Sequence, residues 1–145
     1  MNKTPVIFIV VIVFLGLNIL IGYLAFAEPP DYLINATPES ISVYQGNSSS
    51  FNLNLTSLRD FESKMMVGIK EAPDGVEISM ENDEVQLSNE KNLILKMNVK
   101  VDSKAPAGLY DIVIEANGNG LLHSVDLKLN IIGTGQIIVI IQDFW

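Results

Sequence analysis

Apolar and polar residues alternate along Leu109–Ile131, and no other feature of the chain constrains its fold as strongly. Successive side chains of a β-strand point to opposite faces of the sheet, so an alternating segment has one apolar face and one polar face. The turn sequence Asn117-Gly118-Asn119-Gly120 divides the segment, as in a β-hairpin. The apolar positions on its two sides are Tyr110, Ile112, Ile114, Ala116, Val125, Leu127, Leu129 and Ile131. The segment therefore predicts two antiparallel strands with one buried face and one face in water.

Shorter alternating segments precede this hairpin, and turn sequences rich in Gly and Pro separate them. Their apolar positions are Phe51, Leu53 and Leu55; Met65, Val67 and Ile69; Val76, Ile78 and Met80; Val85 and Leu87; and Leu93, Leu95, Met97, Val99 and Val101. The segments Tyr32–Ala36 and Ile41–Val43 flank Pro38, which predicts an edge strand broken at a proline, because proline has no N–H for a sheet. No window has the period of a helix. About seven to nine short strands of this kind predict an all-β fold, an antiparallel β-sandwich.

The residues before Glu28 form a different kind of segment. Pro5–Ala27 carries no charge, and its apolar run of roughly 20 residues is the length that a helix needs to span a bilayer. Lys3 precedes the run, so the domain that follows is expected outside the cytoplasm. We expect one N-terminal transmembrane helix, an uncleaved signal-anchor. A signal peptide cleaved after Ala27 is the open alternative, because Ala25-Phe26-Ala27 has the small-x-small pattern of a cleavage site. Cleavage would make the protein secreted.

Composition argues against several classes of function. The net charge is −8 and no basic cluster occurs, which argues against binding to nucleic acid phosphates. The chain has no cysteine, so thiol catalysis, cysteine-ligated zinc and disulfides are excluded. His123 is the single histidine, and without a neighbouring nucleophile it is expected to be a surface or hairpin residue. We therefore expect no enzyme activity, no catalytic residues and no cofactor.

Two further motifs suggest ligands or modification. Glu81, Asp83 and Glu84 share one turn, where we expect solvated side chains. Calcium binding is the alternative, although the spacing is not that of an EF-hand loop. Three exported sequons begin at Asn35, Asn47 and Asn54 and are possible N-glycosylation sites. Asn47 is the best candidate, because its sequon lies in a predicted turn.

The C-terminal tail, Gly133–Trp145, contains the continuous β-branched run Ile137–Ile141. This run is too short to span a bilayer, and an exposed run of this kind promotes aggregation. Three fates remain open: a further core strand, a strand donated to a partner, or packing against a membrane or membrane complex. The candidate interaction residues are Ile137, Val139, Ile141, Phe144 and Trp145.

Three turn sequences carry a family resemblance. Ser57–Phe61, Ala72–Val76 and Ala105–Tyr110 followed by the alternating hairpin resemble the immunoglobulin-like repeats of prokaryotic surface proteins, in particular the NEW3 type of archaeal and bacterial envelope proteins. The resemblance covers about residues 38–131 and implies a β-sandwich of seven or eight strands, usually one module among several. It places Tyr110 at the position of a tyrosine-corner residue, whose hydroxyl bonds nearby backbone.

Together these features predict four segments: a signal-anchor or signal peptide over 1–27, a spacer and first edge strand over 28–38, an immunoglobulin-like sandwich over 39–132 and an apolar tail over 133–145. We expect a membrane-anchored extracytoplasmic domain that is a structural or protein-interaction component of the cell envelope, with the membrane and other envelope or membrane proteins as partners. One alternative is an accessory subunit of a membrane-protein complex, capped by the sandwich. The other is a carbohydrate- or surface-binding module, which exposed aromatic side chains would favour. The oligomeric state stays open.

Overall fold

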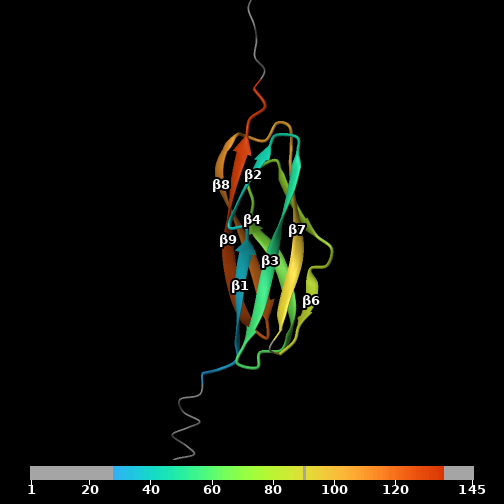
Figure 1. Ribbon diagram of the computed structural model, residues 1–145, viewed down its shortest axis with the longest axis vertical. Helices are drawn as coiled ribbons and strands as arrows, with labels where there is room; N and C mark the ends of the chain where they lie inside the picture. Colours follow the sequence, from blue (N-terminus) through green and yellow to red (C-terminus); the bar gives the residue numbers. More distant parts are fainter. Residues whose placement is uncertain (1–27, 90, 136–145) are drawn as a thin grey trace, which may run out of the picture.

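The computed structural model describes residues 28–89 and 91–135, and every regular element in these residues is a strand. The strands are β1 (Asp31–Thr37), β2 (Ser40–Tyr44), β3 (Ser48–Leu58), β4 (Ser63–Glu71), β5 (Val76–Met80), β6 (Glu84–Leu87), β7 (Asn92–Val101), β8 (Gly108–Gly118) and β9 (Leu121–Ile132). They form a four-stranded sheet in the order β1-β3-β7-β5 and a five-stranded sheet in the order β2-β9-β8-β4-β6. In Figure 1 the four-stranded sheet lies in front of β8 and β9.

The predicted all-β sandwich is confirmed for the described residues. The expected N-terminal helix over residues 1–27 lies outside them, as does most of the C-terminal tail. Among the residues that the structure describes, no helical segment has the length and apolar character needed to cross a bilayer.

The predicted strand phase is confirmed by burial. On β8, the alternate residues Ile112, Ile114 and Ala116 are buried, and on β9 the same holds for Leu127 and Leu129. Side chains at alternate positions of both sheets fill the space between them, which makes one core. The hairpin between β8 and β9 turns at Asn119 and Gly120, both with positive φ (50° and 80°), as its Asn-Gly sequence predicts.

The chain changes sheets at Pro38, where the peptide bond from Thr37 is cis. β1 is an edge of the four-stranded sheet and pairs antiparallel with β3, whereas β2 is an edge of the five-stranded sheet and pairs parallel with β9. The prediction of an edge strand broken at this proline is therefore confirmed. The other ladders of the described residues are antiparallel.

The two ends of the described chain lie at opposite ends of the sandwich (Figure 1). β9 runs the whole distance with 12 residues, which corresponds to about 40 Å at 3.4 Å per residue. We call the end that holds residues 28–31, the β3–β4 turn and the β8–β9 turn the N-terminal pole. The opposite end, with the β2–β3 turn, residues 102–107 and residues 133–135, is the C-terminal pole.

Candidate functional site

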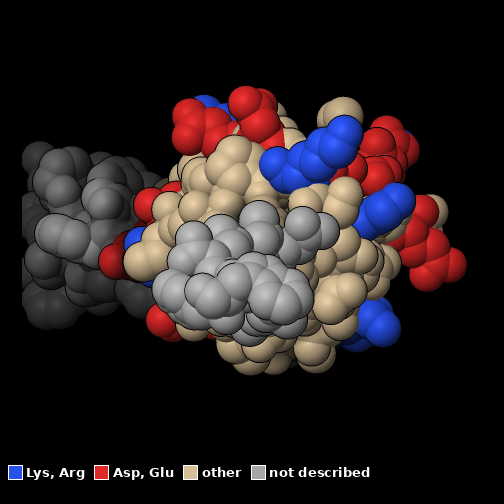
Figure 2. All heavy atoms as spheres, turned by 90° about the horizontal axis from the view of Figure 1, so that it is seen from above, with Lys and Arg blue, Asp and Glu red and all other residues tan. Residues whose placement is uncertain are grey.

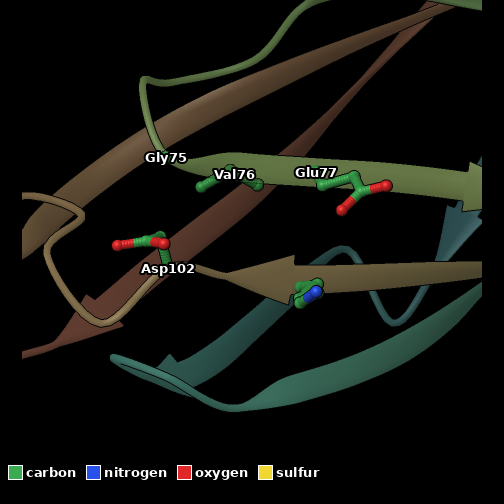
Figure 3. Close-up of a pocket in the computed structure, with 5 residues that line it drawn as sticks. Gly75, Val76, Glu77 and Asp102 are labelled. Carbon is green, nitrogen blue, oxygen red and sulfur yellow. The ribbon is translucent and has the colours of Figure 1, made fainter.

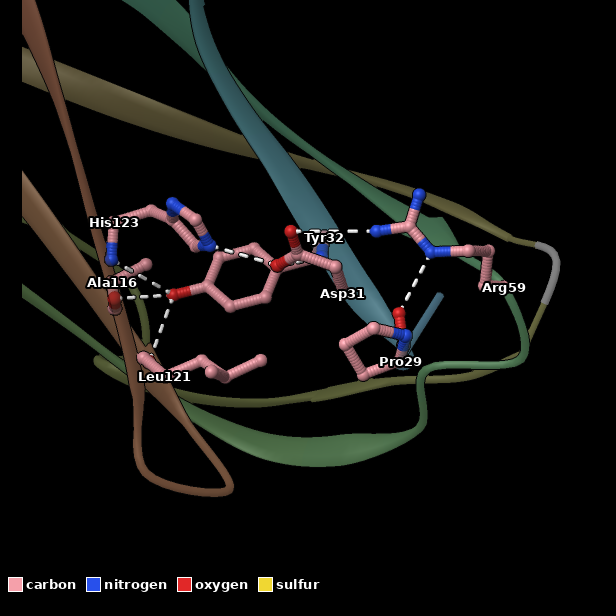
Figure 4. A network of polar contacts seen from close by, with 7 residues as sticks. All are labelled: Pro29, Asp31, Tyr32, Arg59, Ala116, Leu121 and His123. Carbon is pink, nitrogen blue, oxygen red and sulfur yellow. Dashed lines mark hydrogen bonds and ion pairs between the residues drawn. The ribbon is translucent and has the colours of Figure 1, made fainter. Parts of the chain in front are cut away.

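The densest group of interacting polar side chains lies at the N-terminal pole, where the chain enters the sandwich (Figure 4). We call Asp31, Tyr32, Arg59 and His123 the N-terminal clamp. The sheet register brings them together: Asp31 pairs with Leu58, so Arg59 in the following turn lies beside the start of β1. His123 comes from the start of β9 in the other sheet. Arg59 has a positive φ of 50°, which turns the chain sharply after β3.

Arg59 holds the entering chain with three contacts. Its Nη1 lies 2.8 Å from Glu28 Oε2, its Nε donates a hydrogen bond to the Pro29 carbonyl at 2.7 Å, and its Nη2 lies 3.6 Å from Asp31 Oδ2. These groups are exposed or half-buried, so each ion pair by itself stabilises the fold little. The carbonyl bond and the two carboxylates share one rigid guanidinium, however, and this arrangement fixes the direction in which residues 28–31 leave the sandwich.

Asp31 and Tyr32 join this contact to the five-stranded sheet. Asp31 Oδ1 accepts a hydrogen bond from the Tyr32 N–H at 2.8 Å and lies 2.8 Å from His123 Nε2. The Tyr32 N–H and the His123 side chain lower the pKa of the Asp31 carboxyl below its usual value of 3.8. The carboxylate therefore stays ionised beside Arg59 over a wide pH range.

The buried hydroxyl of Tyr32 reaches the backbone of the β8–β9 hairpin. It donates to the Ala116 carbonyl, lies 3.2 Å from the Leu121 carbonyl and accepts the His123 backbone N–H at 3.2 Å. Burial raises the pKa of Tyr32. The ring stacks edge-on against His123, at 4.6 Å between centroids, and packs against Phe61 at 5.0 Å. Tyr32 thus links the two sheets at the pole where the N-terminal segment attaches.

The chemistry of the clamp is that of a structural joint. His123 was expected to be a surface or hairpin residue, and it is a half-exposed hairpin residue bonded to Asp31. The Tyr32 hydroxyl is buried and bonded to backbone groups. Within the described residues, no group of three or more His, Asp or Glu side chains is arranged to hold a metal ion. Glu81, Asp83 and Glu84 therefore do not converge on a common point, and Glu84 instead pairs with Lys64.

A shallow hollow of about 280 Å³ lies at the C-terminal pole, between the start of β5 and the end of β7. Its lining residues are Gly75, Val76, Glu77, Lys100 and Asp102. In Figure 3 the carboxylates of Glu77 and Asp102 point toward opposite ends of the hollow, so they do not form a common ligand set. Asp102 Oδ1 accepts the Lys104 backbone N–H at 2.7 Å and so stabilises the turn. The hollow is a feature of the surface without a convergent polar site.

The three predicted glycosylation residues lie in two places. Asn47 is exposed in the β2–β3 turn at the C-terminal pole. Asn35 and Asn54 are cross-strand partners on the outer face of the four-stranded sheet. The Asn54 side-chain amide donates to Asn35 Oδ1 at 2.9 Å and lies 2.8 Å from Thr37 Oγ1, within hydrogen-bond distance. The Asn54 amide nitrogen is thus hydrogen-bonded in this fold, whereas Asn47 projects into solvent.

Tyr110 makes the hydrogen bond expected of a tyrosine corner, because its hydroxyl donates to the Pro106 carbonyl at 3.1 Å. The candidate interaction residues of the tail, Ile137, Val139, Ile141, Phe144 and Trp145, lie outside the described residues. The clamp itself was missed in the sequence. The turn Ser57–Phe61 stood out only as part of a resemblance, and nothing local connects Arg59 with Asp31 or His123.

Replacing Asp31 with asparagine is expected to lower the melting temperature at neutral pH and to have a much smaller effect in strong acid. The folded-state pKa of Asp31 is below 3.8, so its carboxylate stabilises the fold above that pH. The stabilisation is lost as the pH falls through the folded-state pKa. Thermal unfolding of both proteins from neutral pH to about pH 2 measures this difference. Asp74→Asn, in the exposed turn before β5, is the control. A deficit that stays constant down to the most acidic pH would show that the asparagine disturbs packing rather than charge.

Comparison with known proteins identifies the fold. No protein-family model matches the chain, and no curated protein matches its sequence. Among solved structures, a FixG-related protein from Vibrio parahaemolyticus matches with a TM-score of 0.53 at 12% identity, over 72% of this chain and 97% of that chain. A family 123 glycoside hydrolase from Clostridium perfringens matches with a TM-score of 0.56 at 9% identity, over 72% of this chain and 28% of that chain.

Domains 4 and 5 of the S-layer protein SbsC match with a TM-score of 0.48 at 15% identity, over 72% of this chain and 54% of that chain. This chain thus spans about half or less of the S-layer and hydrolase structures. At such identities the matches show a shared β-sandwich fold and nothing about activity, and the S-layer match is too weak to carry an argument. The NEW3 type is not distinguished by these comparisons and stays a prediction.

Proposed function

We propose that this chain is a non-enzymatic module of the cell envelope, anchored in the membrane by residues 1–27 and displaying a binding segment at its C-terminal pole. The observation that supports this most directly is the position of the two ends of the sandwich. Residue 28 enters at one pole, and residue 135 leaves at the other, about 40 Å away along β9.

The N-terminal clamp supports the same proposal. An anchored domain displays its far end in a defined direction only if the joint beside the anchor is rigid. Arg59 holds Glu28, Pro29 and Asp31 at this joint, and Tyr32 connects it to both sheets. Residues 137–145 then begin on the side away from the anchor. The apolar run ends at Ile141, six residues beyond residue 135, and six extended residues reach at most about 21 Å, which is less than the length of β9. This run would therefore meet a partner rather than the membrane that holds residues 1–27.

The C-terminal pole is suited to contact with other macromolecules. Figure 2 views this pole from above, and on the visible surface of the described residues the charged side chains lie mainly toward the margin of the view. A carbohydrate-binding module is less well supported. Among the aromatic side chains of the described residues, Tyr32, Phe51 and Phe61 are buried in the core, Tyr110 is half-buried and Tyr44 is exposed. The accessory-subunit alternative shares the same anchor and pole, and it differs only in requiring residues 1–27 to pack among other membrane segments.

Cysteine labelling tests the proposed topology, because the native chain has no cysteine. In intact cells, a membrane-impermeant maleimide is expected to label Lys104→Cys at the C-terminal pole and to spare Asn2→Cys. Both variants should be labelled after the membrane is opened. If only Asn2→Cys were labelled in intact cells, the topology would be the opposite of the proposed one, and the proposal would be refuted. A mature chain whose mass begins at Glu28 would refute the anchor and leave an exported module.

A further inference from the structure

One strand of the four-stranded sheet is paired on both sides over only part of its length. β7 has ten residues and pairs with β3 from Asn92 to Lys100. On its other side, β5 has five residues and covers only Met97–Val101. No strand of the described residues covers that side of Asn92–Lys96. We call Asn92–Lys96 the free edge; it lies at the margin of the front sheet in Figure 1.

The hydrogen-bond pattern shows which backbone groups point outward there. The Val101 N–H donates to Asn47, on the β3 side, and the Asp102 N–H donates to Gly75, on the β5 side. Successive residues of an antiparallel strand alternate in this way, so the even-numbered residues point away from β3. Asn92 and Ile94 therefore direct two N–H donors and two carbonyl acceptors to the free edge, where no ladder of the described residues pairs them on that side. Lys96 stands at the boundary with β5, next to the last pair, Met80 with Met97.

Apolar side chains border the free edge on both faces of the sheet. Ile94 is 63% exposed on the outer face. Leu93 and Leu95 point inward and are only partly buried against the core. A hollow of about 320 Å³ opens beside them. Its apolar lining residues are Met80, Val85, Ile94 and Leu95, and its polar ones are Glu81, Asn82, Lys96 and Asn98. An open edge with apolar side chains on both faces is a template for another strand.

We infer that the free edge binds the Ile137–Ile141 segment of a second copy of this chain as an added antiparallel or parallel strand. The segment is apolar on both faces, which suits this position and few others. One set of alternate side chains would enter the hollow beside Leu95 and Val85. The other set would cover Ile94. The segment carries no charge, so it would itself bring no unpaired charge to the edge.

The tail of a molecule cannot occupy the whole free edge of that same molecule. Thr134 is held at the C-terminal pole, where its N–H donates to Gln45 Oε1 at 2.9 Å. Three residues, from Thr134 to Ile137, reach at most about 10 Å. β9 packs against β1 of the four-stranded sheet, and a strand added at the free edge would lie three strand spacings from β1, or about 14 Å. Lys96 lies a further five residues below the pole along β7. The donor must therefore be another molecule.

A tail that leaves one pole and docks on the side of the next molecule makes a head-to-tail contact between different surfaces. Such a contact can repeat and produce chains of molecules rather than closed dimers. The inference rests on the proposed function in one respect, since both copies must be displayed on the same side of the membrane. The inference identifies a second copy of this chain as the partner of the Ile137–Ile141 segment.

Cross-linking of the purified full chain in detergent tests the inference. The double variant Ile94→Cys with Val139→Cys is treated with a short bis-maleimide, and the products are separated by size. A ladder of dimers and larger species is expected, weakening on dilution because the contact is between molecules. Neither single variant should give a ladder. Leu122→Cys with Val139→Cys is the matched control, because Leu122 is similarly exposed (56%) but lies at the N-terminal pole.

The ladder from the Ile94 pair is expected to exceed that from the Leu122 pair several-fold. Ile94 and Leu122 are both exposed, so neither substitution should lower the melting temperature. Unchanged melting temperatures will show that the variants fold. An intramolecular product alone would show that the tail closes its own edge and would overturn the inference. Equal ladders from both pairs would mean general stickiness of the tail, and no product would mean no docking at this edge. Each of these failures would leave the labelling result, and with it the proposed topology, standing.

Discussion

Replacing Ile112 with alanine is expected to lower the free energy of unfolding by about 2–5 kcal/mol. Ile112 is fully buried in the middle of β8, opposite Leu127 of β9, and both side chains lie between the two sheets. Truncation there removes buried methyl groups and leaves a cavity that close-packed neighbours cannot fill. Denaturant unfolding of the purified chain, followed by circular dichroism, measures the loss.

Lys96→Ala is the control for this experiment, and its effect is expected to stay within about 0.5 kcal/mol. Lys96 projects from the outer face of β7, where its ammonium is in water. Equal losses at both positions would contradict the strand phase, because a slip of one residue exchanges every inward side chain for an outward one.

Replacing Gly75 with alanine is expected to destabilise the domain by about 2–4 kcal/mol, for two separable reasons. Gly75 has a φ of +78°, a conformation that L-residues adopt only at a cost. A Cβ added there would also lie 2.9 Å from the Cβ and 3.2 Å from the Cα of Ala105. Ala105 is itself buried, and the Gly75 carbonyl accepts the Asp102 N–H. The two turns of the C-terminal pole are therefore packed against each other at this glycine.

Gly120→Ala separates the two causes. Gly120 has nearly the same φ, +80°, but no atom lies within 4 Å of the position that its Cβ would take. It should lose only the conformational part, about 1–2 kcal/mol. Thermal unfolding of the two variants side by side gives the difference due to the close approach of Ala105. If Gly75→Ala were no worse than Gly120→Ala, the residues 102–107 would have moved away without cost, and the C-terminal pole would be less tightly packed than the structure indicates.

The strands and their buried faces could be predicted because alternation is a local property of the chain. Ile112 and Leu127 were assigned to the inner face from period 2 alone, and the Asn119-Gly120 turn between them needs only residues that accept positive φ. The break at Pro38 was predicted for a similar reason, since a proline lacks the N–H of a ladder wherever it stands. The cis bond and the change of sheet after it depend on which neighbours the two halves find.

Strand pairing depends on contacts between distant residues, and both the N-terminal clamp and the free edge result from it. Arg59, Asp31 and His123 are distant in sequence, and they meet because β1 pairs with β3 and the two sheets stack at that pole. The free edge exists because β5 pairs with only half of β7, while β6 joins β4 in the other sheet. The alternation of Leu93–Val101 and the shortness of Val76–Met80 were both visible in the sequence. By itself the sequence determined an all-β sandwich and an unusually apolar tail. Which backbone groups remain without a partner depends on contacts between residues far apart in the chain, which no local pattern encodes.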